Sequence, residues 1–221
     1  MKSLVMLGGG IDSTVLLAML RNSALDLLAL HVDFGIANKQ KEAAEKVAKK
    51  LNTPLRIVKF DVGVLHKIEE DTKDWRFYPG YGQLLMTLAY SVADQFDCGV
   101  IYTGEYDIVD ESVPHSLENE DIKKWNFSKK RLIWDSNVSA WDESLKLYKK
   151  LYSLNRMQVC HPFAGYAQEN VIQLGMVLKA PFELTMSCVD DSFEGIHCGH
   201  CVKCQERMEA FKKAGCIDEA K

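Results

Sequence analysis

The stretch from Leu4 to Leu17, LVMLGGGIDSTVLL, most constrains what this chain can fold into. An apolar run enters a turn of three glycines, Gly8, Gly9 and Gly10, and an apolar pattern with helical spacing follows the turn. This order predicts a strand, a tight turn and a helix. Glycine has no Cβ, so the backbone N–H groups of such a turn can approach a bound anion closely.

Three polar residues at the start of the helix strengthen the prediction of an anion site. Asp12, Ser13 and Thr14 are residue types that favour the N-cap, and the helix that they start directs its positive dipole end at the same place. The expected guest is a phosphate or pyrophosphate, and a purely structural glycine turn is the alternative. No Gly-Lys-Ser/Thr follows, which excludes a Walker A loop, and Ser13 stands where a dinucleotide-binding G-x-G-x-x-G has its third glycine.

Strand and helix patterns alternate along the chain. Strands are expected over about 3–7, 25–32, 55–60 and 99–103, and helices over about 11–21, 39–51, 83–95, 142–154, 168–178 and 205–213. The alternation predicts an α/β fold with a doubly wound, mainly parallel sheet. Ligands of such sheets lie at the carboxyl ends of the strands, where this chain has its glycine loop and the sequence Asp33-Phe34-Gly35.

The composition is that of an ordinary globular protein, with 47% hydrophobic and 26% charged residues. Its 221 residues suffice for one large domain, or for a domain with a small appendage. A formal net charge of −4 provides no global basic field for nucleic acid. Too few apolar residues precede the glycines for a secretory signal, and no run approaches the length of a membrane span. We therefore expect a cytoplasmic protein that has no membrane partner.

Four of the seven cysteines lie close together near the C-terminus. Their spacing, C-x9-C-x2-C-x2-C, fits a tetrahedral zinc site of four thiolates, formed by Cys188, Cys198, Cys201 and Cys204. Four protein ligands leave no open coordination position, so this zinc would be structural. An iron–sulfur cluster and four unligated thiols are the alternatives. Residues 1–180 are expected to form an ATP-binding domain, and residues 181–221 a zinc-binding segment packed on it.

The motif GGGIDST resembles the SGGxDS loop of the ATP pyrophosphatase (PP-loop) superfamily. That resemblance implies that the loop holds the β- and γ-phosphates of ATP while a substrate oxygen attacks the α-phosphate and pyrophosphate leaves. It implies Asp12 and Ser13 as catalytic residues, and Mg2+ to neutralise the triphosphate. The expected nucleotide contacts are Leu7, Gly8, Gly9, Gly10, Asp12, Ser13, Thr14, His31, Asp33, Phe34 and Gly104.

The loop and the cysteine cluster together resemble the 7-cyano-7-deazaguanine synthase family of queuosine-type purine biosynthesis. The resemblance covers nearly the whole chain and also includes the motifs FYPG at 77–80, YTG at 102–104, HPF at 161–163 and CGHCVKC at 198–204. It implies an ATP-dependent C–N ligase, a homodimer, that adenylates 7-carboxy-7-deazaguanine for attack by ammonia, giving the amide and then the nitrile. The implied substrate contacts are Phe77, Tyr78, Pro79, Gly80, Glu105, Asp107, Asp110, Pro114 and His161.

Several positions depart from the pattern of that family. Gly8 replaces a serine, Tyr81-Gly82 replaces Arg-Asn, and Gln168 replaces a lysine. These changes remove anion contacts from the ATP site, which can slow catalysis greatly. One alternative function is therefore transfer of the activated acyl group to an amine of a protein or nucleic acid. Another is a purine- or nucleotide-binding module with reduced catalysis, and a third is an RNA sulfur transferase that would use Cys98 or Cys160.

Overall fold

The computed structural model describes residues 2–23, 25–35, 38–61, 81–105, 138–152, 157–188, 190, 193–194 and 196–220. Within the described helices, the side chains at 38, 81, 138–142 and 152 are not described. The predicted substrate contacts that lie outside the described residues are Phe77, Tyr78, Pro79, Gly80, Asp107, Asp110 and Pro114.

A parallel five-stranded sheet with the order β3-β2-β1-β4-β5 forms the centre of the protein. Its strands are β1 (Lys2–Met6), β2 (Asp26–Asp33), β3 (Leu55–Lys59), β4 (Cys98–Tyr102) and β5 (Gln158–Cys160). The chain adds strands to one side of β1 and then to the other, so the strand order reverses between β1 and β4. The carboxyl ends of these two strands form the switch point where doubly wound sheets bind ligands. The predicted α/β fold is therefore confirmed.

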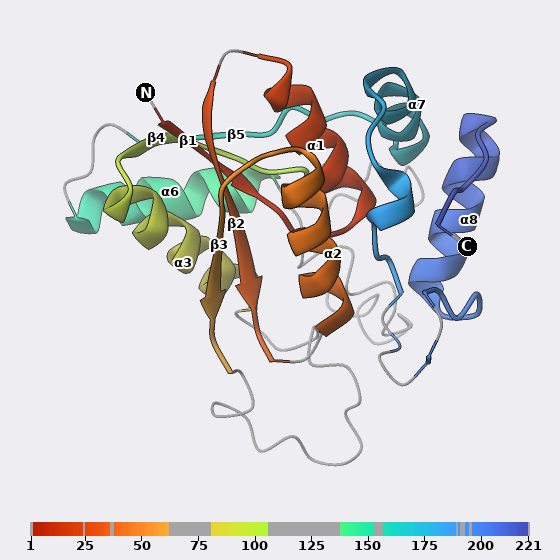
Figure 1. Cartoon of the computed structure of the whole chain (residues 1–221). Helices are drawn as coiled ribbons and strands as arrows, with labels where there is room; N and C mark the ends of the chain where they lie inside the picture. Colours follow the sequence, from red (N-terminus) through yellow and green to blue (C-terminus); the bar gives the residue numbers. More distant parts are fainter. Residues whose placement is uncertain are drawn as a thin grey trace, which may run out of the picture.

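Helices cover both faces of the sheet (Figure 1). On one side lie α1 (Ile11–Arg21), α2 (Asn38–Lys50), α7 (Gln168–Leu178) and α8 (Val202–Ala214); on the other lie α3 (Tyr81–Gln95) and α6 (Val138–Tyr152). Successive strand residues alternate between the two layers. Val5 packs with α1, whereas Leu4 packs with α3, as the two-residue period of a strand requires.

The C-terminal segment packs on α7. Phe211 of α8 meets Phe182 edge to face, with 5.3 Å between the ring centroids, and Phe182 lies in the short 3-10 helix η3 (Phe182–Leu184). Arg207 is 2% exposed, and its guanidinium donates to Asp218 at 2.6 and 2.8 Å and to Thr185 Oγ1 at 2.8 Å. These contacts hold the end of the chain against the α/β core, although the predicted division at residue 180 stays a prediction.

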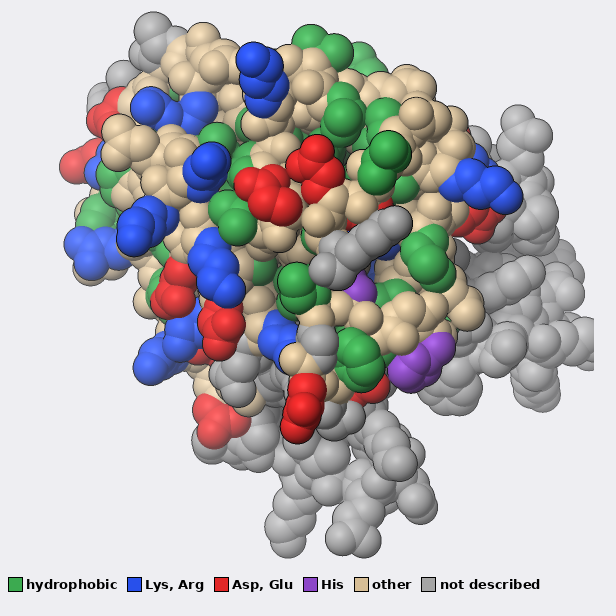
Figure 2. All heavy atoms as spheres, turned by 45° about the vertical axis from the view of Figure 1, so that its right-hand side comes forward, with side chains coloured by type: hydrophobic (Ala, Val, Ile, Leu, Met, Phe, Trp, Pro, Cys, Tyr) green, Lys and Arg blue, Asp and Glu red, His purple; other side chains and the backbone are tan. Residues whose placement is uncertain are grey.

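The face shown in Figure 2 carries acidic and basic side chains interspersed with each other, in keeping with the small net charge of −4. None of the helices in the described part of the chain combines the length and the hydropathy that crossing a bilayer requires.

Candidate nucleotide site and metal cluster

The glycine loop continues the line of β1 at the carboxyl edge of the sheet. The Leu7 N–H donates to the Leu30 carbonyl at 2.8 Å, and the Leu7 carbonyl accepts from His31 Nδ1 at 2.9 Å. Both backbone groups of Leu7 are thus bonded to β2, and the loop begins after it. Burial lowers the pKa of His31, so the imidazole is neutral at pH 7 and carries its proton on Nδ1.

Gly9 fills a place where only glycine fits. Its φ is +84°, and a Cβ there would lie 2.3 Å from the Gln40 carbonyl oxygen of α2. Its own carbonyl accepts from the Met186 N–H at 2.8 Å. Gly8 differs, because an added Cβ would meet nothing closer than Ser13 Oγ at 4.0 Å. The loop is therefore crowded at Gly9 and open at Gly8.

The N-cap prediction for this helix is wrong. Helix α1 begins at Ile11 with Gly10 as its N-cap, and Asp12, Ser13 and Thr14 lie in its first turn. Glycine has no side chain with which to accept a bond from the N–H groups of the first turn. The helix start is built without a side-chain cap because the loop must turn sharply there, and its N–H groups face the carboxyl edge of the sheet.

Asp12 is a buried carboxylate beside the loop. Its two oxygens lie 3.3 and 3.5 Å from Gln168 Nε2 of α7. Burial raises the pKa of Asp12 to about 6, and the Gln168 bond offsets this only in part. The sequence marked Gln168 as a departure but carried no signal for this contact, since the two residues are 156 positions apart.

A cavity of about 330 Å³ opens between the glycine loop and the ends of β2 and β4. That volume lies in the range of small-molecule sites. The predicted contacts that line it are Leu7, Gly8, Gly10, Asp12, Ser13, His31, Gly104 and Glu105. The lining residues that were not predicted are Met6, Leu30, Val32, Gln40, Leu85 and Thr103. Thr103, between β4 and Gly104, was the one with a signal, because it belongs to the YTG motif.

Other predicted contacts lie behind this lining. Asp33 Oδ1 accepts from the Gly35 N–H at 2.9 Å and its Oδ2 pairs with Lys41 at 3.4 Å, and these partners lower its pKa although burial opposes them. Phe34 packs edge to face on Phe60. Thr14 is fully buried, and His161 Nδ1 lies 2.8 Å from Thr103 Oγ1. Their roles toward a ligand stay predictions.

The four clustered cysteines have the geometry of a metal site. Their Sγ atoms all lie within 4.8 Å of one another, with 3.9 Å between Cys198 and Cys204 and 4.0 Å between Cys188 and Cys201. A tetrahedron of thiolates around one ion at 2.3 Å has edges of about 3.8 Å. Backbone N–H groups of Cys198, Cys201 and Cys204 point at cluster sulfurs at 3.3–3.5 Å, which favours the thiolate form. These residues can therefore hold a metal ion.

The same sulfur explains where α8 begins. Cys201 is the N-cap of α8, and its Sγ accepts from the Cys204 N–H. The helix therefore starts at Val202, earlier than the predicted residue 205, because a metal ligand also serves as its cap.

Comparison with known proteins agrees with this site. The family model of the queuosine biosynthesis protein QueC matches residues 2–116 and 134–215. The 7-cyano-7-deazaguanine synthase of Thermoplasma volcanium is 25% identical over 236 residues, covering 100% of this chain and 90% of that protein. The synthase of Methanospirillum hungatei is 24% identical over 242 residues, covering 99% of this chain and 98% of that protein.

Solved structures share the fold at lower identity. The U34-tRNA thiolase NcsA from Methanococcus maripaludis, which has a [4Fe-4S] cluster, gives a TM-score of 0.52 at 18% identity over 96% of this chain and 64% of the thiolase. The NMN synthetase from Francisella tularensis gives 0.52 at 12% identity, over 97% of this chain and 77% of that chain. Both are PP-loop superfamily proteins. The match to the family model spans most of the sequence, and the chain belongs to the QueC family of queuosine biosynthesis proteins.

Proposed function

We propose that this chain is an ATP-dependent ligase that adenylates the carboxylate of 7-carboxy-7-deazaguanine and passes the acyl group to ammonia. The observation that carries the proposal is the place of the glycine loop in a QueC-family chain. It lies at the switch point of the sheet and lines the cavity of about 330 Å³. A homodimer in the cytoplasm accompanies this proposal as an expectation from the family resemblance.

The loop would supply the phosphate cradle. Gly8 and Gly10 line the cavity with backbone, the N–H groups of the first turn of α1 lack a side-chain cap, and Ser13 Oγ adds a hydroxyl. Donors arranged in this way stabilise the negative charge of a leaving pyrophosphate. Mg2+ would neutralise the triphosphate, and the carboxylates of Asp12 and Glu105, which both line the cavity, would hold it.

The chemistry that this site would perform balances in two displacements. A carboxylate oxygen of the substrate bonds to the α-phosphorus of ATP, and the bond between that phosphorus and the bridging oxygen breaks, releasing pyrophosphate. Ammonia then attacks the acyl carbon, AMP leaves with the electron pair of the C–O bond, and one proton passes to solvent. A second ATP would activate the amide oxygen in the same way, so that its loss as AMP leaves the nitrile.

We assign zinc to the cysteine cluster. Both Sγ–Sγ distances of 3.9 and 4.0 Å suit thiolates that share one ion. An iron–sulfur cubane binds each thiolate on a different iron, which requires wider spacing. Four protein ligands close the coordination sphere, so this ion would stabilise the C-terminal segment and take no part in the chemistry.

The second candidate function is a purine- or nucleotide-binding module with reduced catalysis. Gln168 favours it, because this neutral amide is the hydrogen-bond partner of Asp12 where the family pattern has a cation. Transfer of the acyl group to an amine of a protein or nucleic acid is the remaining alternative.

One incubation tests these candidates. The purified protein is mixed with 7-carboxy-7-deazaguanine, ATP, Mg2+ and ammonia, and products are followed by liquid chromatography and mass spectrometry. The proposed ligase forms AMP together with the free amide and nitrile. Binding of ATP without AMP formation would identify the binding module, and AMP formation with an adduct on a macromolecule would identify acyl transfer.

A further inference from the structure

Three segments meet at Gly9: the glycine loop, the first turn of α2 and the segment that leads to the first cysteine of the cluster. The Met186 N–H donates to the Gly9 carbonyl at 2.8 Å, two residues before Cys188. On its other side, Gly9 lies against the Gln40 carbonyl, so closely that no Cβ would fit between them. The position of Gly9 therefore depends on both neighbours.

A small apolar cluster joins the same two neighbours to each other. Ala43 of α2 packs with Met186, Cys188 and Cys204, all of them buried. Since Cys188 and Cys204 are cluster ligands, a bound ion would fix one wall of this packing. Gln40, three residues before Ala43, lines the nucleotide cavity.

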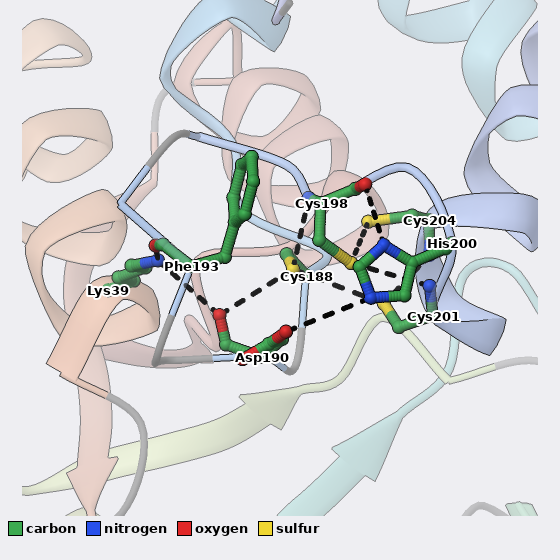
Figure 3. Close-up of polar contacts among 8 residues, drawn as sticks. All are labelled: Lys39, Cys188, Asp190, Phe193, Cys198, His200, Cys201 and Cys204. Carbon is green, nitrogen blue, oxygen red and sulfur yellow. Dashed lines mark hydrogen bonds and ion pairs between the residues drawn. The ribbon is translucent and has the colours of Figure 1, made fainter.

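Lys39 closes the connection. Its Nζ donates to the Asp190 carbonyl at 3.4 Å and to the Phe193 carbonyl, and it lies 5.9 Å from the centroid of the Phe193 ring. Figure 3 shows this side chain reaching from α2 to the cysteine-bearing segment beside the four cysteines. The described lining of the cavity does not include Lys39, so any effect of this residue on ATP would be transmitted through its neighbours.

We propose that Lys39 is a positioning residue that couples metal binding at the cysteine cluster to ATP binding at the glycine loop. The inference rests on the proposed function, since it requires ATP in the cavity and a metal on the cysteines. A bound ion orders the segment from Cys188 onward, and Lys39 transmits that order to the first turn of α2 and so to Gly9. Linkage makes the effect reciprocal: if the ion raises the affinity for ATP, ATP raises the affinity for the ion by the same factor.

The test measures this factor directly. Zn2+ affinity is determined by competition with a chromophoric chelator, with and without the Mg2+ complex of α,β-methylene-ATP, whose α–β bond is not cleaved. We expect the nucleotide to raise Zn2+ affinity by roughly five- to tenfold in the wild-type protein. Lys39→Met should reduce the factor to within about twofold of unity, and Lys39→Arg, which keeps the charge and the donors, should restore most of it.

Lys46→Met is the matched control. Lys46 lies on the same helix, its side chain is 62% exposed and its ion-pair partner is Glu42 of the same helix, so the coupling factor should equal that of the wild type. Phe193→Ala is a second test at a 38% exposed side chain, where truncation spares folding. It removes the ring contact and leaves the carbonyl, so it should lower the factor partway.

The outcomes separate the inference from the function on which it rests. A wild-type protein that binds Zn2+ and nucleotide independently would overturn the inference alone, as would a Lys39→Met variant with the wild-type factor. A wild-type protein that binds no Zn2+ or no nucleotide would overturn the proposed function as well.

Discussion

Asp12 is buried beside the glycine loop, and burial raises its pKa from an ordinary value of 3.8 to about 6. Between these values the native protein holds a proton that the unfolded chain releases. Stability therefore falls as the pH rises through this window, by about 3 kcal/mol when the window has been crossed. A carboxylate this costly is typical of a functional site, where a cation or a ligand offsets the burial of its charge.

Asp12→Asn should remove that cost. At pH 7.5 the ligand-free variant should melt roughly 5–10 °C above the wild type, with a smaller gain at pH 4.5, where native Asp12 is already protonated. AMP formation should be lost, because the charge that would hold Mg2+ is gone. Differential scanning fluorimetry at both pH values and an AMP assay measure these effects, with Asp94→Asn, at an exposed position of α3, as the control. An equal change at both pH values would contradict the raised pKa.

Gly8→Ser tests the phosphate cradle. The backbone at Gly8 does not have positive φ and a Cβ there meets nothing within 4.0 Å, so serine fits and its hydroxyl can reach the phosphates. A hydrogen bond to a charged group is worth about 1.5–3 kcal/mol, or about ten- to a hundredfold in affinity. Calorimetric titration of ATP measures the gain, and Gly8→Ala adds the same Cβ without the hydroxyl. Equal affinity of the two variants would contradict the proposed role.

The packing of the glycine loop on α2 belongs to the scale of the elements. Gly9→Ala would force a Cβ against the Gln40 carbonyl and would place a side chain at a φ of +84°. We expect a loss of about 3 kcal/mol in the free energy of unfolding, from strain and overpacking together, and a loss of ATP binding. Urea denaturation measures the first effect and calorimetry the second.

The control for this variant isolates the backbone strain. Gly215→Ala has a similar positive φ of +68°, at the end of α8, and nothing lies within 4 Å of the added Cβ. It should cost only about 1 kcal/mol and leave ATP binding unchanged. If the two variants were equally destabilised, the close approach of Gly9 to α2 would have no energetic weight.

At the scale of the whole molecule, the cysteine cluster connects the C-terminal segment to the core. We expect about one zinc per chain, because four thiolates complete one tetrahedral site, and metal binding contributes folding free energy. Cys204→Ser should lose the ion and lower the melting temperature, as should treatment of the wild type with a chelator. Elemental analysis and thermal melting measure both effects.

Cys216→Ser is the matched control, because Cys216 lies beyond α8 and is no member of the cluster. Its metal content should equal that of the wild type. Well-folded Cys204→Ser protein with full zinc content would contradict the assignment, and about four irons per chain in the wild type would point to an iron–sulfur cluster instead.

Local patterns in the sequence were enough to determine most of the elements and both candidate sites. The apolar period and the three glycines predicted the strand, the turn and helix α1, whose bounds at Ile11–Arg21 agree with the prediction, as do those of α7 at Gln168–Leu178. The cysteine spacing alone identified the metal cluster. These features are encoded over a few consecutive residues, where helix and strand periods and ligand spacing act directly.

Only the tertiary structure decided which distant residues meet. The bond from Gln168 to Asp12, the close approach of Gln40 to Gly9 and the reach of Lys39 to the cysteine segment all join residues far apart in the chain. Strand β5 also escaped prediction, because its three residues are too few to show a period. Such contacts depend on how helices pack on the sheet, and packing is settled by the shapes of all the neighbouring side chains together, which no local pattern contains.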